Sequence, residues 1–174
     1  VDADVQEAAR RLMPLPPAAG QEPLPPLGNL VQRRGDVVRG ATAFRTTAAC
    51  AKCHKVDGKG KEVGPDLSGI GRKLSRSALY ESVLFPSAGI SHNYETYLIE
   101  LVSGNVLSGV LVSQTNEVVV LKTKEAIEKS IKKEDVELMQ KSETSLMPAD
   151  LVKTMTQNQL ADIVEYLSTL KKQK

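Results

Sequence analysis

Aromatic residues are scarce in this chain, and tryptophan is absent. Only 3% of the 174 residues are aromatic, which is little bulk for the core of a chain of this length. This shortage is consistent with a core in which a large bound apolar group replaces aromatic side chains. No apolar run approaches the ~20 residues of a membrane-spanning helix, and a net charge of +2 is too small to indicate nucleic acid. We therefore expect neither a transmembrane segment nor a nucleic-acid partner.

Cysteine and histidine are equally rare, and their placement is the strongest signal in the sequence. Both cysteines and one of the two histidines lie together in residues 50–54, Cys-Ala-Lys-Cys-His. This spacing is the signature of c-type haem attachment, because two nearby thiols can each form a thioether with one porphyrin while the adjacent imidazole binds the iron. Cys50, Cys53 and His54 are therefore predicted to hold a single covalent haem c.

Three other interpretations of the motif remain: a redox Cys-x-x-Cys pair, half of a zinc site, or a chance match. A thioredoxin-like pair needs a βαβ context, and a zinc site needs a second pair of ligands downstream. The sequence offers neither, since the second histidine, His92, stands alone.

Residues 1–35 are expected to form an N-terminal extension outside a haem domain of residues 36–174. Residues 1–13 have the spacing of a short helix. Residues 14–27 contain six of the nine prolines, which favours an extended linker. This linker would act as a leash to another domain or run along the surface of the haem domain.

The chain begins at Val1 without the basic start and apolar stretch of a signal peptide. Haem attachment to this motif normally happens outside the cytoplasm. We therefore expect a periplasmic or otherwise exported protein whose leader has been removed.

Two helices are predicted before the middle of the chain. The first begins at Asp36, a good N-cap, and its inward face is expected to carry Val37, Ala41, Phe44 and Ala48. Gly40 lies inside this helix at a cost of about 1 kcal/mol relative to alanine, which suggests close packing against another element. The second helix spans residues 74–84, has Ser75 or Ser77 as its cap, and has Leu79, Val83 and Leu84 facing inward.

The last predicted helix has the clearest start signal. Thr156 and Gln159 form a capping box, and Met155 and Leu160 occupy the positions of a hydrophobic staple. The apolar stripe then consists of Leu160, Ile163, Val164, Leu167 and Leu170.

Between residues 94 and 140 the apolar pattern changes to that of strands. Turn signals such as Ser103-Gly104-Asn105 separate the segments. We predict an antiparallel meander with its own small core, made of strands at 94–102, 106–112 and 117–121 and of two shorter candidate strands at 127–131 and 136–139. A helix over residues 124–133 is the alternative to the fourth strand.

Few side chains could bind the iron opposite His54. Met147 precedes Pro148, which favours an extended backbone and can turn the thioether of Met147 outward from its loop. Met13, Met139 and Met155 are expected to be packing residues. His92 or an open position is the alternative to Met147 as the sixth ligand.

These features resemble the class I cytochromes c. The resemblance rests on Asp36–His54, on residues 64–67 (Gly-Pro-Asp-Leu), on Met147-Pro148 and on the helix Leu160–Leu170. It implies that the N- and C-terminal helices of the haem domain cross, with Gly40 and Phe44 meeting Tyr166. It also implies that the Pro65 carbonyl accepts a hydrogen bond from the proximal histidine and that Leu67 packs on the haem ring.

The strands have no counterpart in plain class I cytochromes. The chain is more similar to the haem-binding domain of Pirellula/Verrucomicrobium type, whose landmarks resemble residues 94–97, 104–109 and 145–148. The expected fold is mainly α, a class I cytochrome c with an inserted small antiparallel β-sheet, α+β overall. Such domains usually belong to larger exported proteins, so a redox protein or a fused dehydrogenase-type domain is the expected partner.

The expected function is transfer of single electrons and not catalysis, through a haem ligated by His54 and Met147. Arg72 is placed in sequence where it could neutralise a haem propionate. A haem enzyme or gas sensor with an open sixth position is the alternative, and a non-haem interaction domain built on the strands is a third hypothesis. Basic residues outnumber acidic ones between residues 52 and 76, an excess that could steer an acidic partner or simply be solvated.

Overall fold

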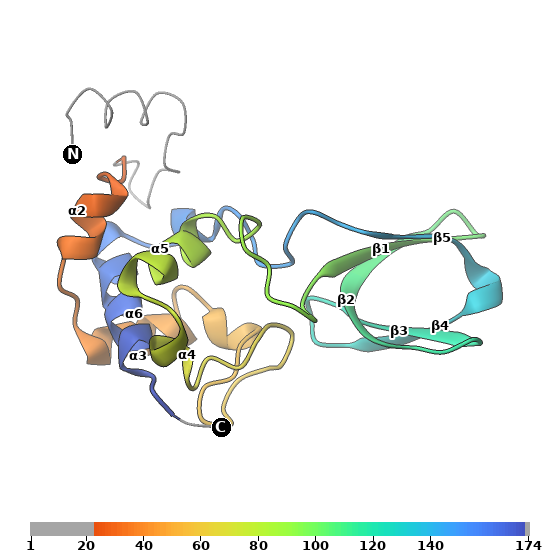
Figure 1. Cartoon of the computed structure of the whole chain (residues 1–174), viewed down its shortest axis with the longest axis horizontal. Helices are drawn as coiled ribbons and strands as arrows, with labels where there is room; N and C mark the ends of the chain where they lie inside the picture. Colours follow the sequence, from red (N-terminus) through yellow and green to blue (C-terminus); the bar gives the residue numbers. More distant parts are fainter. Residues whose placement is uncertain (1–22, 173–174) are drawn as a thin grey trace. The chain divides into compact units, whose positions relative to one another are not determined.

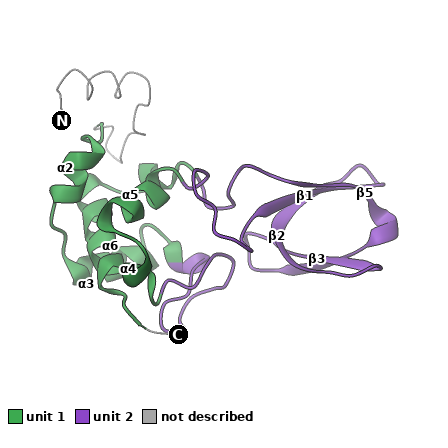
Figure 2. Cartoon of the chain, in the orientation of Figure 1, with its two compact units in different colours: residues 1–50, 68–85, 149–174 green, residues 51–67, 86–148 purple. Residues whose placement is uncertain are grey.

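The computed structural model describes residues 23–172. The chain divides into two units, coloured separately in Figure 2. The first unit takes residues 1–50, 68–85 and 149–174, and the second takes residues 51–67 and 86–148. The predicted helix over residues 1–13 lies outside the described residues.

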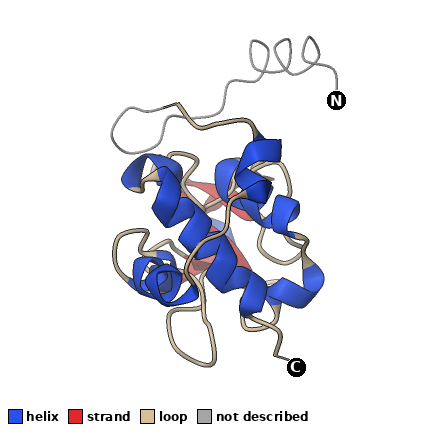
Figure 3. Cartoon of the chain, turned by 90° about the vertical axis from the view of Figure 1, so that its left-hand side faces the viewer, coloured by secondary structure: helices blue, strands red, loops and turns tan. Residues whose placement is uncertain are grey.

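The first unit is helical. Figure 3 shows the helices in blue, crossing one another and joined by loops. Within residues 23–172 no helix is both long enough and apolar enough to cross a membrane. The helices are α2 (Leu27–Gln32), α3 (Val37–Arg45), α4 (Ile70–Lys73), α5 (Arg76–Leu84) and α6 (Gln157–Thr169), preceded by the short 3-10 helix η3 (Leu151–Thr154).

The predicted caps of these helices are confirmed. The Asp36 side chain accepts a hydrogen bond from the Arg39 amide, 2.8 Å, at the start of α3, and Ser75 caps α5. At the start of α6 the capping box is complete, because the Thr156 hydroxyl accepts from the Gln159 amide while the Gln159 side chain accepts from the Thr156 amide. These local hydrogen bonds fix where the helices begin.

The inward face of α3 is only partly as predicted. Gly40, Ala43 and Phe44 are buried, but the Val37 side chain was expected to face inward and is 39% exposed. That expectation was wrong because crossing helices meet mainly around one turn. Gly40 occupies that turn, so the first residue of α3 lies towards the rim of the contact.

The crossing of α3 and α6 depends on a close backbone approach. A Cβ at Gly40 would clash with the backbone carbonyl of Asp162 and lie 2.9 Å from the Tyr166 Cβ. Four residues later, the rings of Phe44 and Tyr166 pack edge to face with centroids 5.6 Å apart. The expected contact of Gly40 and Phe44 with Tyr166 is confirmed, and it joins elements far apart in the sequence.

Gly40→Val is expected to lower the free energy of unfolding by roughly 3 kcal/mol, since the added atoms meet backbone that cannot move aside. Gly28→Ala is the matched control. No atom lies within 4 Å of a Cβ at Gly28 in α2, so this change should be neutral or raise stability by about 0.5 kcal/mol. Denaturant unfolding measures both, and equal losses would contradict the close approach at Gly40.

A buried carboxylate also joins α6 to the start of α3. Asp162 is 4% exposed and accepts hydrogen bonds from the Asp36 amide, 2.6 Å, and from Arg39 Nε, 2.8 Å. Burial raises the pKa of Asp162, but the hydrogen bonds from Arg39 and Asp36 outweigh it, so the pKa is lowered overall. Asp162 is therefore ionised at neutral pH and ties the two helices together, a role that the apolar stripe of α6 does not reveal.

Helix α2 was not predicted, because its residues follow the prolines and show no helical stripe. Leu30 is fully buried, and α2 packs on α5. The Arg76 guanidinium of α5 donates to the Val31 carbonyl, 3.0 Å, and the side-chain amide of Gln157 donates to the Pro23 carbonyl, 3.1 Å. The described residues that follow Pro23 are therefore packed against helices of the same unit. Most of the predicted linker lies outside the described residues, so the choice between its two expected arrangements stays a prediction.

The second unit contains a five-stranded antiparallel sheet (Figure 1). All five predicted strands are present, but the expectation of a plain meander was wrong. The strand order is β4-β3-β2-β1-β5, so β5 pairs with β1 after the 3-10 helix η2 (Lys133–Asp135) carries the chain away from β4. The strands are β1 (Thr96–Leu101), β2 (Val106–Gln114), β3 (Val118–Lys122), β4 (Glu128–Lys132) and β5 (Val136–Lys141).

The sheet has its own apolar core, as the alternation of its residues predicted. Ile99, Val119, Leu121 and Ile131 are buried together, and each comes from a strand. Met139 of β5 packs against this cluster, which confirms its expected packing role. Partly buried side chains complete the core: Tyr97, Leu101, Leu107, Leu111 and Val136.

Candidate functional site

Backbone hydrogen bonds fold the segment that follows Cys50 back on itself. The Cys53 carbonyl accepts from the amides of both Val63 and Gly64, at 2.9 and 2.8 Å. The Lys61 amide donates to the Ala51 carbonyl, 3.0 Å. These bonds shape residues 51–67, called here the attachment loop, through the chain's own backbone.

The two thiols lie at one 3-10 turn, with Cys50 at its start and Cys53 just past its end. Both side chains are half-buried, and Cys50 Sγ donates to the Ala48 carbonyl, 3.8 Å. Burial raises the pKa of the Cys53 thiol, Lys61 opposes this, and Glu125 adds to it. The pair therefore has the spacing and partial exposure that two adjacent thioether bonds require.

His54 is held in the tautomer that suits a metal ligand. Its Nδ1–H donates to the Pro65 carbonyl at 2.8 Å, which is the hydrogen bond that the resemblance implied. Burial lowers the pKa of His54, and the hydrogen bond to Pro65 offsets only part of that effect. The imidazole is therefore neutral at neutral pH and keeps the lone pair of Nε2 for a metal.

Gly64 lets the loop lie directly against this ring. A Cβ at Gly64 would come within 2.5 Å of His54 Cε1 and 2.9 Å of Nδ1. The Gly-Pro-Asp-Leu segment is conspicuous in the sequence, but nothing there predicts this role of Gly64. Leu67, two residues after Pro65, is half-buried. Two thiols and an oriented neutral imidazole fit a covalently bound haem.

The candidates for the sixth iron ligand differ in how far their side chains are buried. The Met147 side chain is half-buried in its loop, and its amide donates to the Ser145 hydroxyl, 3.1 Å. The His92 side chain is 88% exposed, and its Nδ1 lies 3.8 Å from Glu95 Oε1. Met155 is 1% exposed just before α6, as expected of a staple residue.

The remaining predicted positions are less informative. Met13 lies outside the described residues, and Arg72 is exposed in the last turn of α4. Among residues 23–172 no group of three or more histidine, cysteine, aspartate or glutamate side chains could hold a bare metal ion.

The cytochrome c family model matches residues 37–98, from the first residue of α3 through the attachment loop and α5 into β1. A search of curated proteins finds no match. The Cys-x-x-Cys-His motif, the oriented His54 and this family match together support a c-type cytochrome domain that binds haem c covalently and carries electrons.

Proposed function

We propose that this chain carries single electrons through one haem c attached at Cys50 and Cys53, with His54 and Met147 as the axial ligands of the iron. When bound, the haem supplies the Fe(II)/Fe(III) couple. The observation that carries the proposal is the hydrogen bond from His54 Nδ1 to the Pro65 carbonyl. It fixes the proton on Nδ1 and directs the imidazole to bind through Nε2.

Met147 is the best candidate for the second ligand by comparison with the other sulfur and imidazole groups. Met139 and Met155 already pack in apolar clusters, and His92 points into solvent. Met147 is half-buried in a loop held by hydrogen bonds, and it belongs to the same unit as His54. A thioether ligand favours Fe(II) and raises the potential, which suits an electron carrier.

Three further residues complete the proposed site. Pro65 orients His54, Leu67 would pack on the haem ring, and Arg72 would neutralise a haem propionate. We also assign the chain to the Pirellula/Verrucomicrobium type of haem domain, because its five-stranded sheet lies in sequence between α5 and α6, where that type has its insertion.

The proposed partner is a redox protein or a fused dehydrogenase-type domain of an exported, periplasmic protein. The structure divides the basic residues near the motif into two groups. Lys55 is paired with Glu62, 2.5 Å, and Arg76 with Glu165, 2.8 Å. Lys52, Lys59 and Lys73 are exposed and remain available to steer an acidic partner.

Absorption spectroscopy tests this proposal on the unaltered protein. We expect a Soret band, a pyridine haemochrome typical of two thioethers, and a weak far-red band in the oxidised state that marks thioether ligation. The reduced protein should not bind carbon monoxide at room temperature, because both axial positions are filled. Ready binding of carbon monoxide would instead support a haem enzyme or gas sensor with an open sixth position.

A further inference from the structure

The turn between β3 and β4 is tightly formed. The Thr123 amide donates to the Ile127 carbonyl and the Ala126 amide donates to the Thr123 carbonyl, both at 2.9 Å. Ala126 adopts φ +67°, a left-handed conformation that costs an alanine about 1 kcal/mol. The turn thus holds a strained residue in place, next to Glu125.

Lys61 of the attachment loop reaches this turn. Its ammonium donates a hydrogen bond to the Glu125 backbone carbonyl, 3.1 Å, while its own amide is bonded to the Ala51 carbonyl inside the motif. One residue therefore connects the tip of the hairpin to the backbone between the two cysteines.

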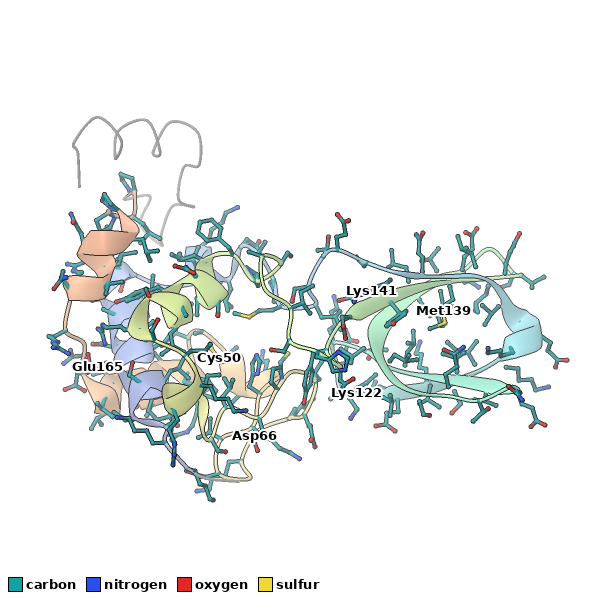
Figure 4. The ribbon with its side chains drawn as sticks, viewed as in Figure 1. Cys50, Asp66, Lys122, Met139, Lys141 and Glu165 are labelled. Atoms are coloured by element: carbon teal, nitrogen blue, oxygen red, sulfur yellow. The ribbon has the colours of Figure 1, made fainter. Side chains whose placement is uncertain are left out.

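A second interaction lies next to the first. Lys55 pairs with Glu62 at 2.5 Å. The pKa of Glu62 is lowered mainly by this hydrogen bond, with a smaller contribution from Lys122. Lys122 ends β3 and lies, with Lys141, at one end of the sheet (Figure 4). Lys61 thus contacts the β3–β4 hairpin directly, while the charge of Lys122 acts on the neighbouring Glu62.

We propose that the β3–β4 hairpin, residues 122–128, is a docking element that holds the attachment loop, and that Lys61 is the positioning residue at this contact. The inference rests on the proposed function, because it concerns the loop that carries His54. In this proposal the inserted sheet supplies no iron ligand. Its role is to support the part of the attachment loop that is hydrogen-bonded to the motif.

The experiment compares three variants of the haem-containing protein by amide hydrogen exchange. Lys61→Met removes the hydrogen bond, Lys61→Arg keeps a donor, and Lys59→Met removes the same charge from an exposed side chain two residues away. We expect the amides of Thr123 and Ala126 to exchange about fivefold faster in Lys61→Met, which is the loss of one ordinary hydrogen bond. Lys61→Arg should restore protection, and Lys59→Met should leave it unchanged.

The redox potential provides the readout that a purely structural contact would not move. Both lysine-to-methionine changes remove a positive charge near the site, so each should lower the potential. Lys61→Met should lower it further, since the loop around Cys53 also loses its support. Equal potentials and equal exchange in Lys61→Met and Lys59→Met would overturn the docking proposal. If the docking proposal fails in this way while the far-red band is present, the proposed electron-carrier function still holds. If the unaltered protein has no far-red band, the proposed function is wrong, but the contact between Lys61 and the hairpin is not contradicted.

Discussion

The double substitution Cys50→Ser, Cys53→Ser is expected to abolish covalent haem and to unfold most of the domain. The chain has few aromatic residues and no tryptophan, so we expect its core to depend on a bound porphyrin for apolar bulk. A group that binds only the folded state contributes about 4 kcal/mol when its concentration is a thousand times its dissociation constant. We expect a loss of at least that size in the free energy of unfolding.

Acid–acetone extraction measures the first effect, because covalently attached haem stays with the protein and free haem does not. Each single substitution is the control, since it leaves one thiol and should retain one thioether. Haem that stays with the protein after extraction of the double variant would show that other residues attach it. A double variant with unchanged denaturant unfolding would show that the core does not need the porphyrin.

Met147→Ala is expected to eliminate the far-red band of the oxidised protein, to lower the potential, and to let the reduced protein bind carbon monoxide. Loss of the thioether removes the ligand that favours Fe(II), and water or hydroxide takes its place. The fold should survive, because Met147 is half-buried in a loop and the cap of α6 is unaffected. We expect a change in the free energy of unfolding of only about 1 kcal/mol beyond the loss of the iron bond.

Three substitutions serve as controls for Met147→Ala. Met155→Ala should cost about 3 kcal/mol of stability, because this side chain is 1% exposed and leaves a cavity, yet the band should remain. Met139→Ala should weaken only the core of the sheet, and His92→Ala should have little effect. If one of these variants loses the band while Met147→Ala keeps it, the ligand assignment is wrong.

Local signals predicted much of this fold correctly. Asp36, Ser75 and Thr156 cap their helices through hydrogen bonds to residues three positions away, so a short stretch of sequence contains the whole interaction. The strands were located by their alternation and turn residues for the same reason. Gly104 at φ +81° lies in the predicted turn between β1 and β2.

Features that depend on distant residues were missed. Helix α2 is stabilised by Arg76 of α5, and nothing within residues 27–32 indicates that contact. The pairing of β5 with β1 joins residues about 40 positions apart, such as Ile99 and Met139, so strand signals alone could not give the order. At the candidate site, the motif predicted Cys50, Cys53 and His54 as haem-binding residues, but the contact of Lys61 with Glu125 could not be predicted without the folded chain.

The pairing of β1 with β5 also bears on the entropy of the chain. The ends of the insertion are fastened to each other, because Tyr97 pairs with Lys141 and the Ser142 amide donates to the Thr96 carbonyl, 2.8 Å. Closer to Met147, the Ser145 amide donates to the Ser87 hydroxyl, 3.1 Å.

Closing an open loop costs more as the loop lengthens, by about 0.6 kcal/mol for each doubling. Here the pairing of the strands within the sheet offsets the entropy lost by the insertion. The rest of the chain has to order only the short segments before Thr96 and after Ser142. At the end of the sheet opposite the Tyr97–Lys141 pair, strands and turns can therefore lengthen or shorten. Such changes would leave the backbone path from the sheet to Met147 unaltered.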